Sequence, residues 1–259
     1  MLRFASLGSG SSGNATLVEA RSGAGAPTRV LIDCGVGWRA LQAALAARGV
    51  ALGELAAVFI THEHSDHTAS AARLHDLGIP IHTSAGTREA LRAAGFKGSV
   101  HTVRDGQHVP IGALLLQPFT VPHDAREPLQ LRCSDGARHL GVMTDCGHLS
   151  AHAARNLAGC HALVLEANHD PDMLAAGRYP AFLKRRIAGA HGHLSNEQAA
   201  AALAQLAHEW LHCVVAAHLS EHNNLPELAR AALARALGCK EDDIPAATRH
   251  GAPAEWYGV

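Results

Sequence analysis

Short runs of apolar residues, each closed by turn or charged residues, recur along the chain and predict buried β-strands. The runs are residues 2–7, 15–20, 30–33, 57–60, 80–83, 100–103, 114–121, 129–133, 140–144, 162–166 and 213–217. Between them, apolar residues at helical spacing predict helices at 36–48, 69–77, 84–94, 150–157, 196–211 and 225–237. We expect Ser195 with Gln198, and Asn224 with Glu227, to cap the last two helices, and Gly238 to end the second.

The order of these elements predicts the fold class. Strands and helices interleave without a strict βαβ rhythm, and no linker or change of composition divides the chain. We therefore expect an α/β (α+β) architecture in a single domain over residues 1–259, with two sheets packed together and helices outside them.

The composition restricts the class of protein further. With 259 residues, 47% hydrophobic and 17% charged, the chain can bury a sizeable core, and disorder is not expected. A net charge of -1 gives no global attraction to nucleic acid or membrane, so such binding would need a local patch. Six scattered cysteines indicate free thiols in a reducing compartment, and no run approaches the roughly 18 apolar residues of a membrane span. We expect a cytoplasmic protein.

The strand predicted at residues 57–60 is followed closely by four side chains of the types that bind metal ions. They are His62, His64, Asp66 and His67. Imidazole and carboxylate are ligands that Zn²⁺ and similar ions accept. His62 and His64 point to the same side of an extended chain, and a helix starting at Ser65 would turn the next two toward a second point. Among 20 histidines an isolated pair would mean little, but four ligands within six positions at a strand end indicate a metal site.

Three more potential ligands also end apolar strands: His123, Asp145 and His218. Strand ends at one edge of a sheet converge in space, so these residues can join the first four. Seven ligands exceed one tetrahedral ion and suit two ions sharing a carboxylate, for which Asp145 is the natural bridge. The first ion would take His62, His64 and His123, and the second would take Asp66, His67 and His218. Taken singly, His123 or His218 is more typical of a core histidine, but together with the cluster the set indicates metal ligands.

This pattern of His-x-His-x-Asp-His after a strand, with later strand-end His, Asp and His, resembles the metallo-β-lactamase superfamily. The resemblance covers essentially the whole chain. It implies a four-layer αββα sandwich and a hydrolase with two metal ions. It also implies that Asp66 both binds the second ion and handles the proton of the attacking water.

Further stretches resemble the YycJ-type small exonucleases, relatives of ribonucleases Z and J. They are SLGSGSSGN (6–14), LIDCG (31–35), LEANHD (165–170), GRYP (177–180), LKRRI (183–187), GHLSN (192–196) and HLSEHNN (218–224). Cys146 and Ala167 depart from the family pattern, where Thr and Ser are common, and neither is a proposed ligand. The length leaves no room for a β-CASP insertion. The resemblance implies 5′-to-3′ exonuclease action on DNA.

A basic stretch between residues 173 and 190 is the candidate for phosphate binding. It has no acidic residue and contains Arg178, Lys184, Arg185 and Arg186, while Tyr179 and Phe182 could stack on a base. A solvated helix face is the competing interpretation. Ser11, Asn14 and Ser195 are further candidates for contacts in the cleft. His193, just before the cap Ser195, is placed to contact a scissile phosphate as a catalytic residue, and ribonuclease Z-like relatives have a histidine in the corresponding place.

These features predict a hydrolase that cleaves phosphodiester bonds of nucleic acid with a hydroxide bridging two divalent ions, and the resemblance implies DNA rather than RNA as the substrate. Zn²⁺ suits the histidine-rich ligand set best, and Mn²⁺ is the alternative. A small-molecule hydrolase of the same fold, such as a β-lactamase, lactonase, thioesterase or cyclic-nucleotide hydrolase, is the rival, although the basic stretch has no obvious task on a small neutral substrate. A flavodiiron-like redox protein would need a flavin partner, and a non-catalytic scaffold would not need an open two-metal site.

Overall fold

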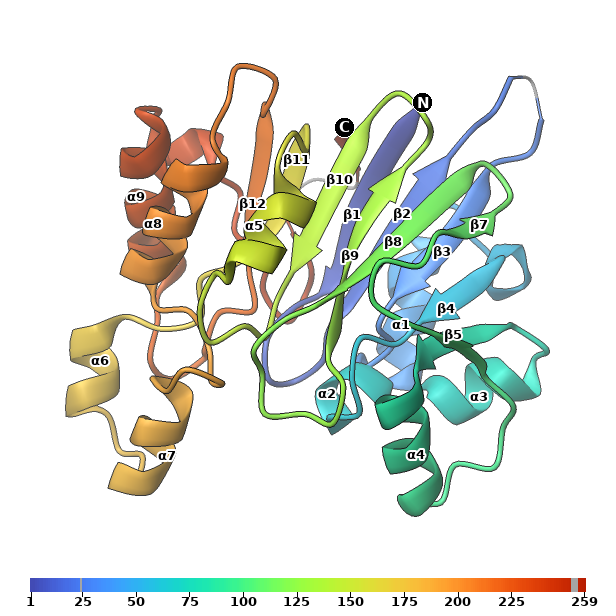
Figure 1. Cartoon of the computed structure of the whole chain (residues 1–259), viewed down its shortest axis with the longest axis horizontal. Helices are drawn as coiled ribbons and strands as arrows, with labels where there is room; N and C mark the ends of the chain where they lie inside the picture. The colour runs from blue at the N-terminus through green and yellow to red at the C-terminus, as the bar shows by residue number, and fades with distance from the viewer. Residues whose placement is uncertain (24, 253–255) are drawn as a thin grey trace.

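The computed structural model describes residues 1–23, 25–252 and 256–259. Within these residues, two β-sheets lie face to face between two sets of helices (Figure 1). The four-layer αββα sandwich expected from the sequence is therefore confirmed. Most predicted strands and helices are present within a few residues of their expected bounds.

The first sheet is built mainly from the N-terminal part of the chain. Its seven strands have the order β13-β1-β2-β3-β4-β5-β6. Their bounds are β1 (Leu2–Gly8), β2 (Ala15–Ala20), β3 (Thr28–Ile32), β4 (Ala57–Phe59), β5 (Ile81–Ser84), β6 (His101–Val103) and β13 (Tyr257–Gly258). Strands β1 to β3 pair antiparallel, whereas β3 to β6 pair parallel, so the ends of β3 and β4 lie at the same edge.

The second sheet has six strands in the order β12-β11-β10-β9-β8-β7. Their bounds are β7 (Val109–Ile111), β8 (Leu114–Thr120), β9 (Leu129–Ser134), β10 (His139–Met143), β11 (Ala162–Glu166) and β12 (Cys213–Ala217). Strand β7 was not predicted, and Pro110 is tolerated in it because β7 is an edge strand. Strands β10, β11 and β12 run parallel, so their carboxyl ends meet at one edge.

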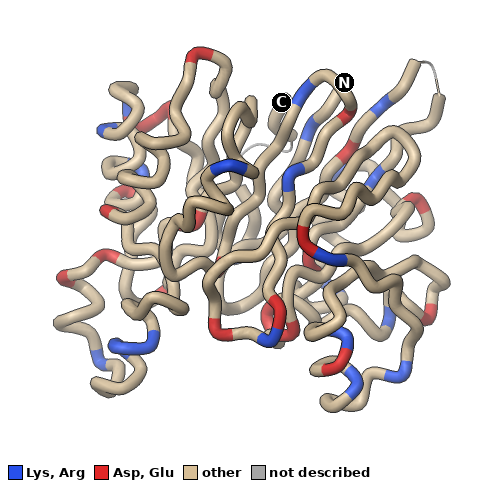
Figure 2. Tube along the Cα trace, in the orientation of Figure 1, with Lys and Arg blue, Asp and Glu red and all other residues tan. Residues whose placement is uncertain are grey.

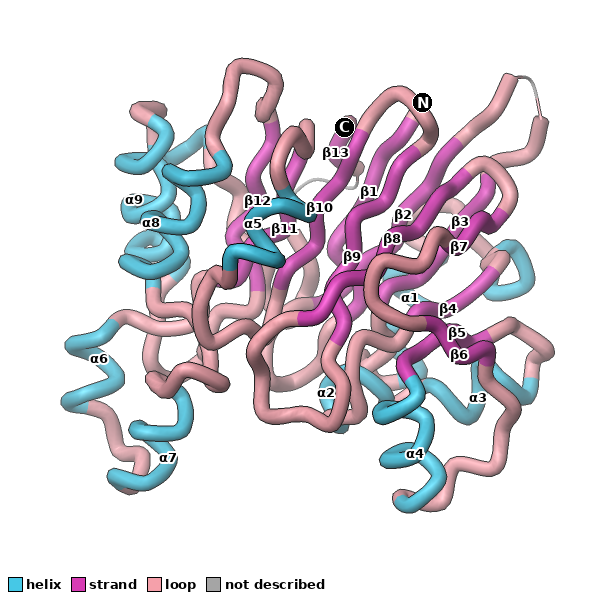
Figure 3. The backbone as a smooth tube through the Cα atoms, viewed as in Figure 1, coloured by secondary structure: helices cyan, strands magenta, loops and turns pink. Residues whose placement is uncertain are grey.

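Most helices cover the outer face of one of the two sheets, whereas one pair of helices lies away from both sheets (Figure 3). The first sheet carries α1 (Trp38–Ala46), α2 (Ser65–Thr68), α3 (Ala71–Asp76), α4 (Ala85–Ala93) and the short η1 (Leu52–Glu54). The second carries α5 (Ala151–Leu157), α8 (Asn196–Leu206), α9 (Pro226–Leu237) and η2 (Glu241–Asp243). Helices α6 (Pro171–Ala176) and α7 (Ala181–Ile187) project from one end of the molecule, and we call them the α6–α7 arm.

Three apolar clusters hold these layers together. One lies between the sheets, where Phe4 and Phe59 of the first sheet and Leu131 of the second are fully buried. The others lie between each sheet and its helices. Each large apolar side chain that is fully buried contributes about 1.5–3 kcal/mol to stability, which holds the layers together. The packed layers in turn fix the position of the sheet edge at which the predicted ligands lie.

The two predicted helix caps have different outcomes. Ser195 accepts from the Gln198 amide in a capping box at the start of α8, as predicted. Asn224 does not cap α9, and this prediction was wrong: the N-cap is Leu225, with Pro226 at the first helical position. The Asn224 amide instead forms a reciprocal pair with Asn196, at 2.8 and 2.9 Å, which ties the starts of α8 and α9 together.

None of the helices in the described part of the chain is both long and apolar enough to cross a membrane.

Candidate metal centre and active site

Residues that end several strands meet at one edge of the sandwich, beside α2 (Figure 1). Among the described residues, the non-glycine residues with positive φ all lie here: Asp33 at 60°, Asp145 at 54° and His218 at 55°. Left-handed backbone costs roughly 1–2 kcal/mol per residue, although Asp tolerates it better than most residue types. At the ends of β3, β10 and β12 it turns the chain sharply and directs these side chains toward a common centre.

His62, His64 and His123 form the first cluster of potential ligands. His62 Nε2 lies 3.0 Å from His64 Nδ1, and His123 Nε2 lies 3.4 Å from the same atom. Two nitrogens bound tetrahedrally to one Zn²⁺ at about 2.0–2.1 Å are about 3.3–3.4 Å apart. The three nitrogens thus have spacings close to those of ligands to one ion.

Asp66, His67, Asp145 and His218 form the second cluster. His67 Nε2 lies 3.2 Å from Asp145 Oδ2 and 3.5 Å from Asp66 Oδ2. His218 Nε2 lies 3.5 Å from Asp145 Oδ1 and 3.6 Å from Asp66 Oδ2. Asp145 Oδ1 is also 3.8 Å from His123 Nε2 of the first cluster. Asp145 therefore lies between the two clusters, where a bridging carboxylate is expected.

The chemistry of these donors fits bound divalent ions. Asp145 Oδ2 and His218 Nε2 are buried atoms without a hydrogen-bond partner. A buried polar atom left unpaired costs about 1–3 kcal/mol, so native proteins rarely tolerate one without a reason. Ions bound to the two clusters would satisfy both atoms, and the seven residues predicted from the sequence are the ones that the fold brings together.

Protein groups hold the ring nitrogens that face away from the clusters. Asp33 Oδ2 lies 2.8 Å from His67 Nδ1, and the Thr61 hydroxyl donates to the same oxygen at 2.9 Å. His123 Nδ1 lies 3.1 Å from the carbonyl oxygen of Gly192. Such partners fix both the orientation and the tautomer of an imidazole, so that Nε2 of each ring faces its cluster.

Glu166, at the end of β11, is the most heavily used of these supporting residues. Its carboxylate is fully buried and accepts from five donors. The donors are His218 Nδ1 at 2.8 Å, His193 Nδ1 at 2.9 Å, and the backbone amides of Asp145 at 3.0 Å, Cys146 at 3.0 Å and Leu194 at 2.9 Å. Burial opposes ionisation, but the charges and hydrogen bonds of the two histidines lower the pKa of Glu166 to about 2. Glu166 is therefore an anion that orients two imidazoles at once.

Burial and neighbouring charges also shift the pKa values of the ligand residues. Burial, reinforced by the charge of His67, holds the pKa of His62 well below its ordinary value. Burial acts on His67 and His218 too, but Asp145 and other carboxylates outweigh it, raising the pKa of His67 and bringing that of His218 to about 10. The same histidines lower the pKa of Asp66 and Asp145 despite burial. The carboxylates are therefore ionised at neutral pH, as ligands of a divalent ion must be.

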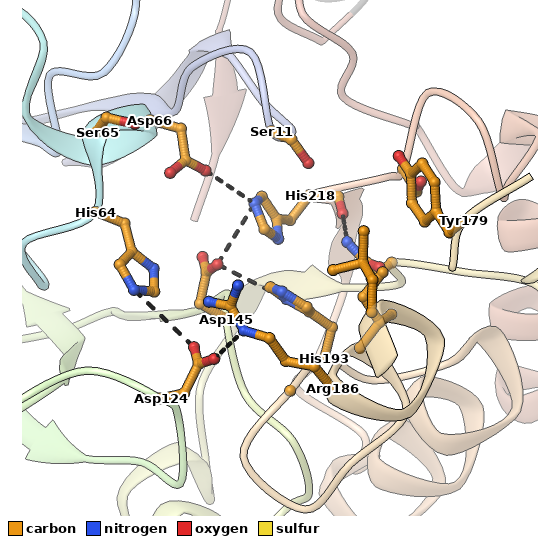
Figure 4. Close-up of a pocket in the computed structure, with 15 residues that line it drawn as sticks. Ser11, His64, Ser65, Asp66, Asp124, Asp145, Tyr179, Arg186, His193 and His218 are labelled. Atoms are coloured by element: carbon orange, nitrogen blue, oxygen red, sulfur yellow. Dashed lines mark hydrogen bonds and ion pairs between the residues drawn. The ribbon is translucent and has the colours of Figure 1, made fainter. Parts of the chain in front are cut away.

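A cavity of about 320 Å³ opens over these residues. Ligand residues of both clusters, together with Ser11 and His193, line part of it, and the α6–α7 arm contributes Tyr179, Leu183 and Ile187. Figure 4 shows Tyr179 on the side of the pocket away from His64 and Asp66. The cavity therefore has a charged side at the ligand clusters, and on the arm side three largely apolar residues lie beside one arginine, Arg186.

Two of the residues predicted to bind phosphate line this cavity, Ser11 and Arg186. Arg186 Nε donates to Asp124 Oδ2, and Asp124 Oδ1 lies 3.5 Å from His123 Nε2. The guanidinium of Arg186 thus reaches from the arm toward the first cluster, as Figure 4 shows.

The other predicted phosphate contacts lie outside the cavity lining. Lys184 Nζ donates to the Ala175 carbonyl at 2.6 Å, and Arg178 and Arg185 are exposed on the arm, where Figure 2 shows basic residues. Asn14 lies deeper, with Nδ2 3.1 Å from His67 Nε2 and 3.3 Å from Asp66 Oδ2. The Ser195 hydroxyl caps α8. A direct phosphate contact by any of these residues stays a prediction.

Three acidic residues at the site were not among the sequence predictions: Asp33, Asp124 and Glu166. Asp33 and Glu166 satisfy the criterion that selected the ligands, because each follows or ends an apolar strand. That criterion alone could have found them. Asp124 follows His123 in a loop, and only the fold shows that it meets an arginine 62 positions later.

Comparisons with known proteins agree with this geometry. Residues 28–218 match the family described as "Beta-lactamase superfamily domain". The chain is 33% identical over 244 residues to exodeoxyribonuclease YycJ of Bacillus anthracis, covering 91% of this chain and 89% of the relative. It is 30% identical over 241 residues to exodeoxyribonuclease WalJ of Streptococcus pneumoniae, covering 91% and 88%. A crystal structure of the metallo-beta-lactamase fold protein YhfI from Bacillus subtilis superposes with a TM-score of 0.72 at 17% identity, covering 96% and 97% of the two chains, which is a likeness of fold.

Proposed function

The chain belongs to the beta-lactamase superfamily, and we propose that it is a metal-dependent phosphodiesterase that shortens DNA from a 5′ end. One observation carries the proposal: Asp145 belongs to one ligand cluster and lies 3.8 Å from His123 of the other, beside a cavity that Arg186 also lines. The names of its relatives, both exodeoxyribonucleases, support a nuclease rather than a β-lactamase.

Two divalent ions would be held by the residues of the two clusters. The first would be held by His62, His64 and His123, the second by Asp66, His67 and His218, and Asp145 would be the ligand common to both. Zn²⁺ suits these ligands best, and Mn²⁺ is the alternative. When bound, such ions lower the pKa of water and polarise a phosphoryl oxygen, which is the chemistry that phosphodiester hydrolysis needs.

The protein residues around the cavity move protons and place the substrate. Asp66 lines the cavity, and the resemblance to the superfamily implies that it takes the proton of the attacking water. Burial opposes protonation of His193, but Glu166 outweighs it and raises the pKa of His193. Since Nδ1 of His193 donates to Glu166, Nε2 is free to donate to a phosphoryl oxygen or to the leaving oxyanion.

Cationic and hydroxyl groups supply the contacts to the nucleic acid. Arg186 and Ser11 line the cavity, and Arg178, Lys184 and Arg185 extend the positive charge along the arm. Lysine and arginine attract a phosphate backbone without regard to sequence. A small neutral ester or lactam would gain little from this surface, which favours a polyanionic strand as substrate. The cytoplasm as its location stays a prediction.

Replacing the bridging carboxylate tests the proposal. Asp145→Ala should abolish nuclease activity and lower the bound metal by one ion per chain, because the two proposed ions would lose the carboxylate placed between them. Asp105→Ala is the matched control, since Asp105 lies on the surface beside His152 and away from the clusters. The measurements are hydrolysis of end-labelled DNA and metal content by mass spectrometry. Full activity of Asp145→Ala with both ions retained would contradict the bridging assignment.

A further inference from the structure

The α6–α7 arm presents an apolar surface to the cavity. Leu183 and Ile187 are four residues apart on α7, so they lie on the same face of the helix, and both line the cavity. Tyr179 precedes the helix and lines it too. The ring centroids of Tyr179 and His222 are 6.1 Å apart and the ring planes are 89° apart, so His222 restrains the Tyr179 ring from one side. Phe182, by contrast, is 66% exposed and does not line the cavity.

An apolar surface opposite two clusters of charged residues suits a ligand that has one apolar end and one charged end. A phosphate attracted by Arg186 and the clusters would leave the rest of the ligand against Tyr179, Leu183 and Ile187. A nucleobase matches that surface, because every base has a π-face that stacks on an aromatic ring regardless of sequence. Charged or extended polar groups would lose hydration there without compensation.

The size of the cavity limits how much of a strand can enter. Its volume of about 320 Å³ lies at the lower end of the range for ligand pockets, about 300–1,000 Å³. This room suits one nucleotide and not a base pair. A base must leave its partner before it can enter such a pocket, which costs a few kcal/mol in a duplex and much less at an unpaired end.

We infer that Tyr179, Leu183 and Ile187 form a subsite for a single unpaired nucleobase. The substrate class is then a strand whose terminal nucleotide is single-stranded, and the product is a mononucleotide. This inference rests on the proposed function and narrows it. A phosphodiesterase with this subsite would cleave a strand that ends in an intact nucleotide faster than a strand that ends in an abasic residue.

A strand with and without its terminal base tests the subsite. Two single-stranded DNA oligonucleotides are compared, identical except that one has an abasic tetrahydrofuran residue at its 5′ end. The wild-type protein should release the first nucleotide from the normal strand about 5-fold to 150-fold more efficiently, in kcat/KM, which is the range expected for one base–aromatic stack. Tyr179→Ala should bring this ratio toward one, whereas Tyr179→Phe, which keeps the ring, should retain it.

The controls separate this inference from the proposed function. Trp210→Ala should leave the ratio and the rates unchanged, because Trp210 is an exposed aromatic residue that does not line the cavity. Equal cleavage of the normal and abasic strands by the wild-type protein would overturn the base subsite while leaving a nuclease. Failure to cleave either strand or methyl p-nitrophenyl phosphate, with Zn²⁺ or Mn²⁺ bound, would overturn the proposed function and the inference with it.

Discussion

Glu166 offers a sensitive test of how the fold supports the two clusters, through the substitution Glu166→Gln. The carboxylate uses both oxygens: Oε1 accepts from His193, His218 and the Asp145 amide, and Oε2 accepts from the Cys146 and Leu194 amides. Glutamine fills the same volume but has one acceptor oxygen and one donor group. Whichever way its amide turns, at least two buried donors lose their acceptor.

The magnitude follows from that loss of acceptors. Each buried donor left unpaired costs about 1–3 kcal/mol, so Glu166→Gln should lower the free energy of unfolding by about 2–6 kcal/mol. Loss of the anion also frees two imidazoles, one of them the proposed ligand His218. Changes in groups that orient metal ligands typically reduce metal affinity or activity about 10-fold to 100-fold.

Urea unfolding, metal competition titration and DNA hydrolysis would measure these effects. Glu63→Gln is the matched control, because Glu63 accepts from the Arg126 amide and the Thr87 hydroxyl and contacts no ligand imidazole. Metal affinity and turnover of Glu166→Gln within about twofold of the wild type would refute the assigned role of Glu166.

Two further predictions concern stability. Glu19 is fully buried, with carboxylate oxygens 2.7 Å from Arg29 Nε and 2.7 Å from the Arg3 guanidinium, so Glu19→Ala should lower the free energy of unfolding in urea by about 3–5 kcal/mol. Glu89→Ala, which removes an exposed ion pair, should change it by less than about 1 kcal/mol, and equal effects would contradict the account. Burial and the charge of His101 lower the pKa of His82 from 6.5 to about 4. Between these two pH values the unfolded chain binds a proton at this residue and the folded chain does not. The free energy of unfolding should therefore fall as the pH drops from 6.5 to about 4. His82→Gln should lose less stability than the wild type between about pH 7 and about pH 5 in urea titrations, and parallel losses would exclude this role.

The ligand residues could be predicted from the sequence because their signal is local. Four of them follow one apolar run and the other three follow separate apolar runs, so the rule that parallel strand ends share an edge predicts that they lie together. Gly35 shows how tightly the loop with the four ligands packs against the end of β3. A Cβ at residue 35 would lie 1.6 Å from the Asp66 carbonyl oxygen, so only glycine allows this packing. The four layers follow from the same alternation of strands and helices.

Contacts between residues far apart in sequence could not be predicted in this way. The Asn224 cap was expected from a local motif, but a buried amide partner 28 positions away competes for its side chain. Lys184 and Arg186 belong to one basic run, yet Lys184 donates to the Ala175 carbonyl whereas Arg186 donates to Asp124. Charge in a sequence shows that a surface is basic, whereas helix orientation decides which of its side chains reach the cavity.

A panel of substrates tests the proposed exonuclease activity. The metal-loaded protein would be given 5′-labelled and 3′-labelled single strands of DNA and of RNA, with Zn²⁺, Mn²⁺ or Mg²⁺, and nitrocefin in parallel. A 5′-to-3′ exonuclease of DNA should release labelled mononucleotide from 5′-labelled DNA, progressively shorten 3′-labelled DNA, and leave nitrocefin intact. Turnover of nitrocefin without cleavage of either nucleic acid would contradict the proposal.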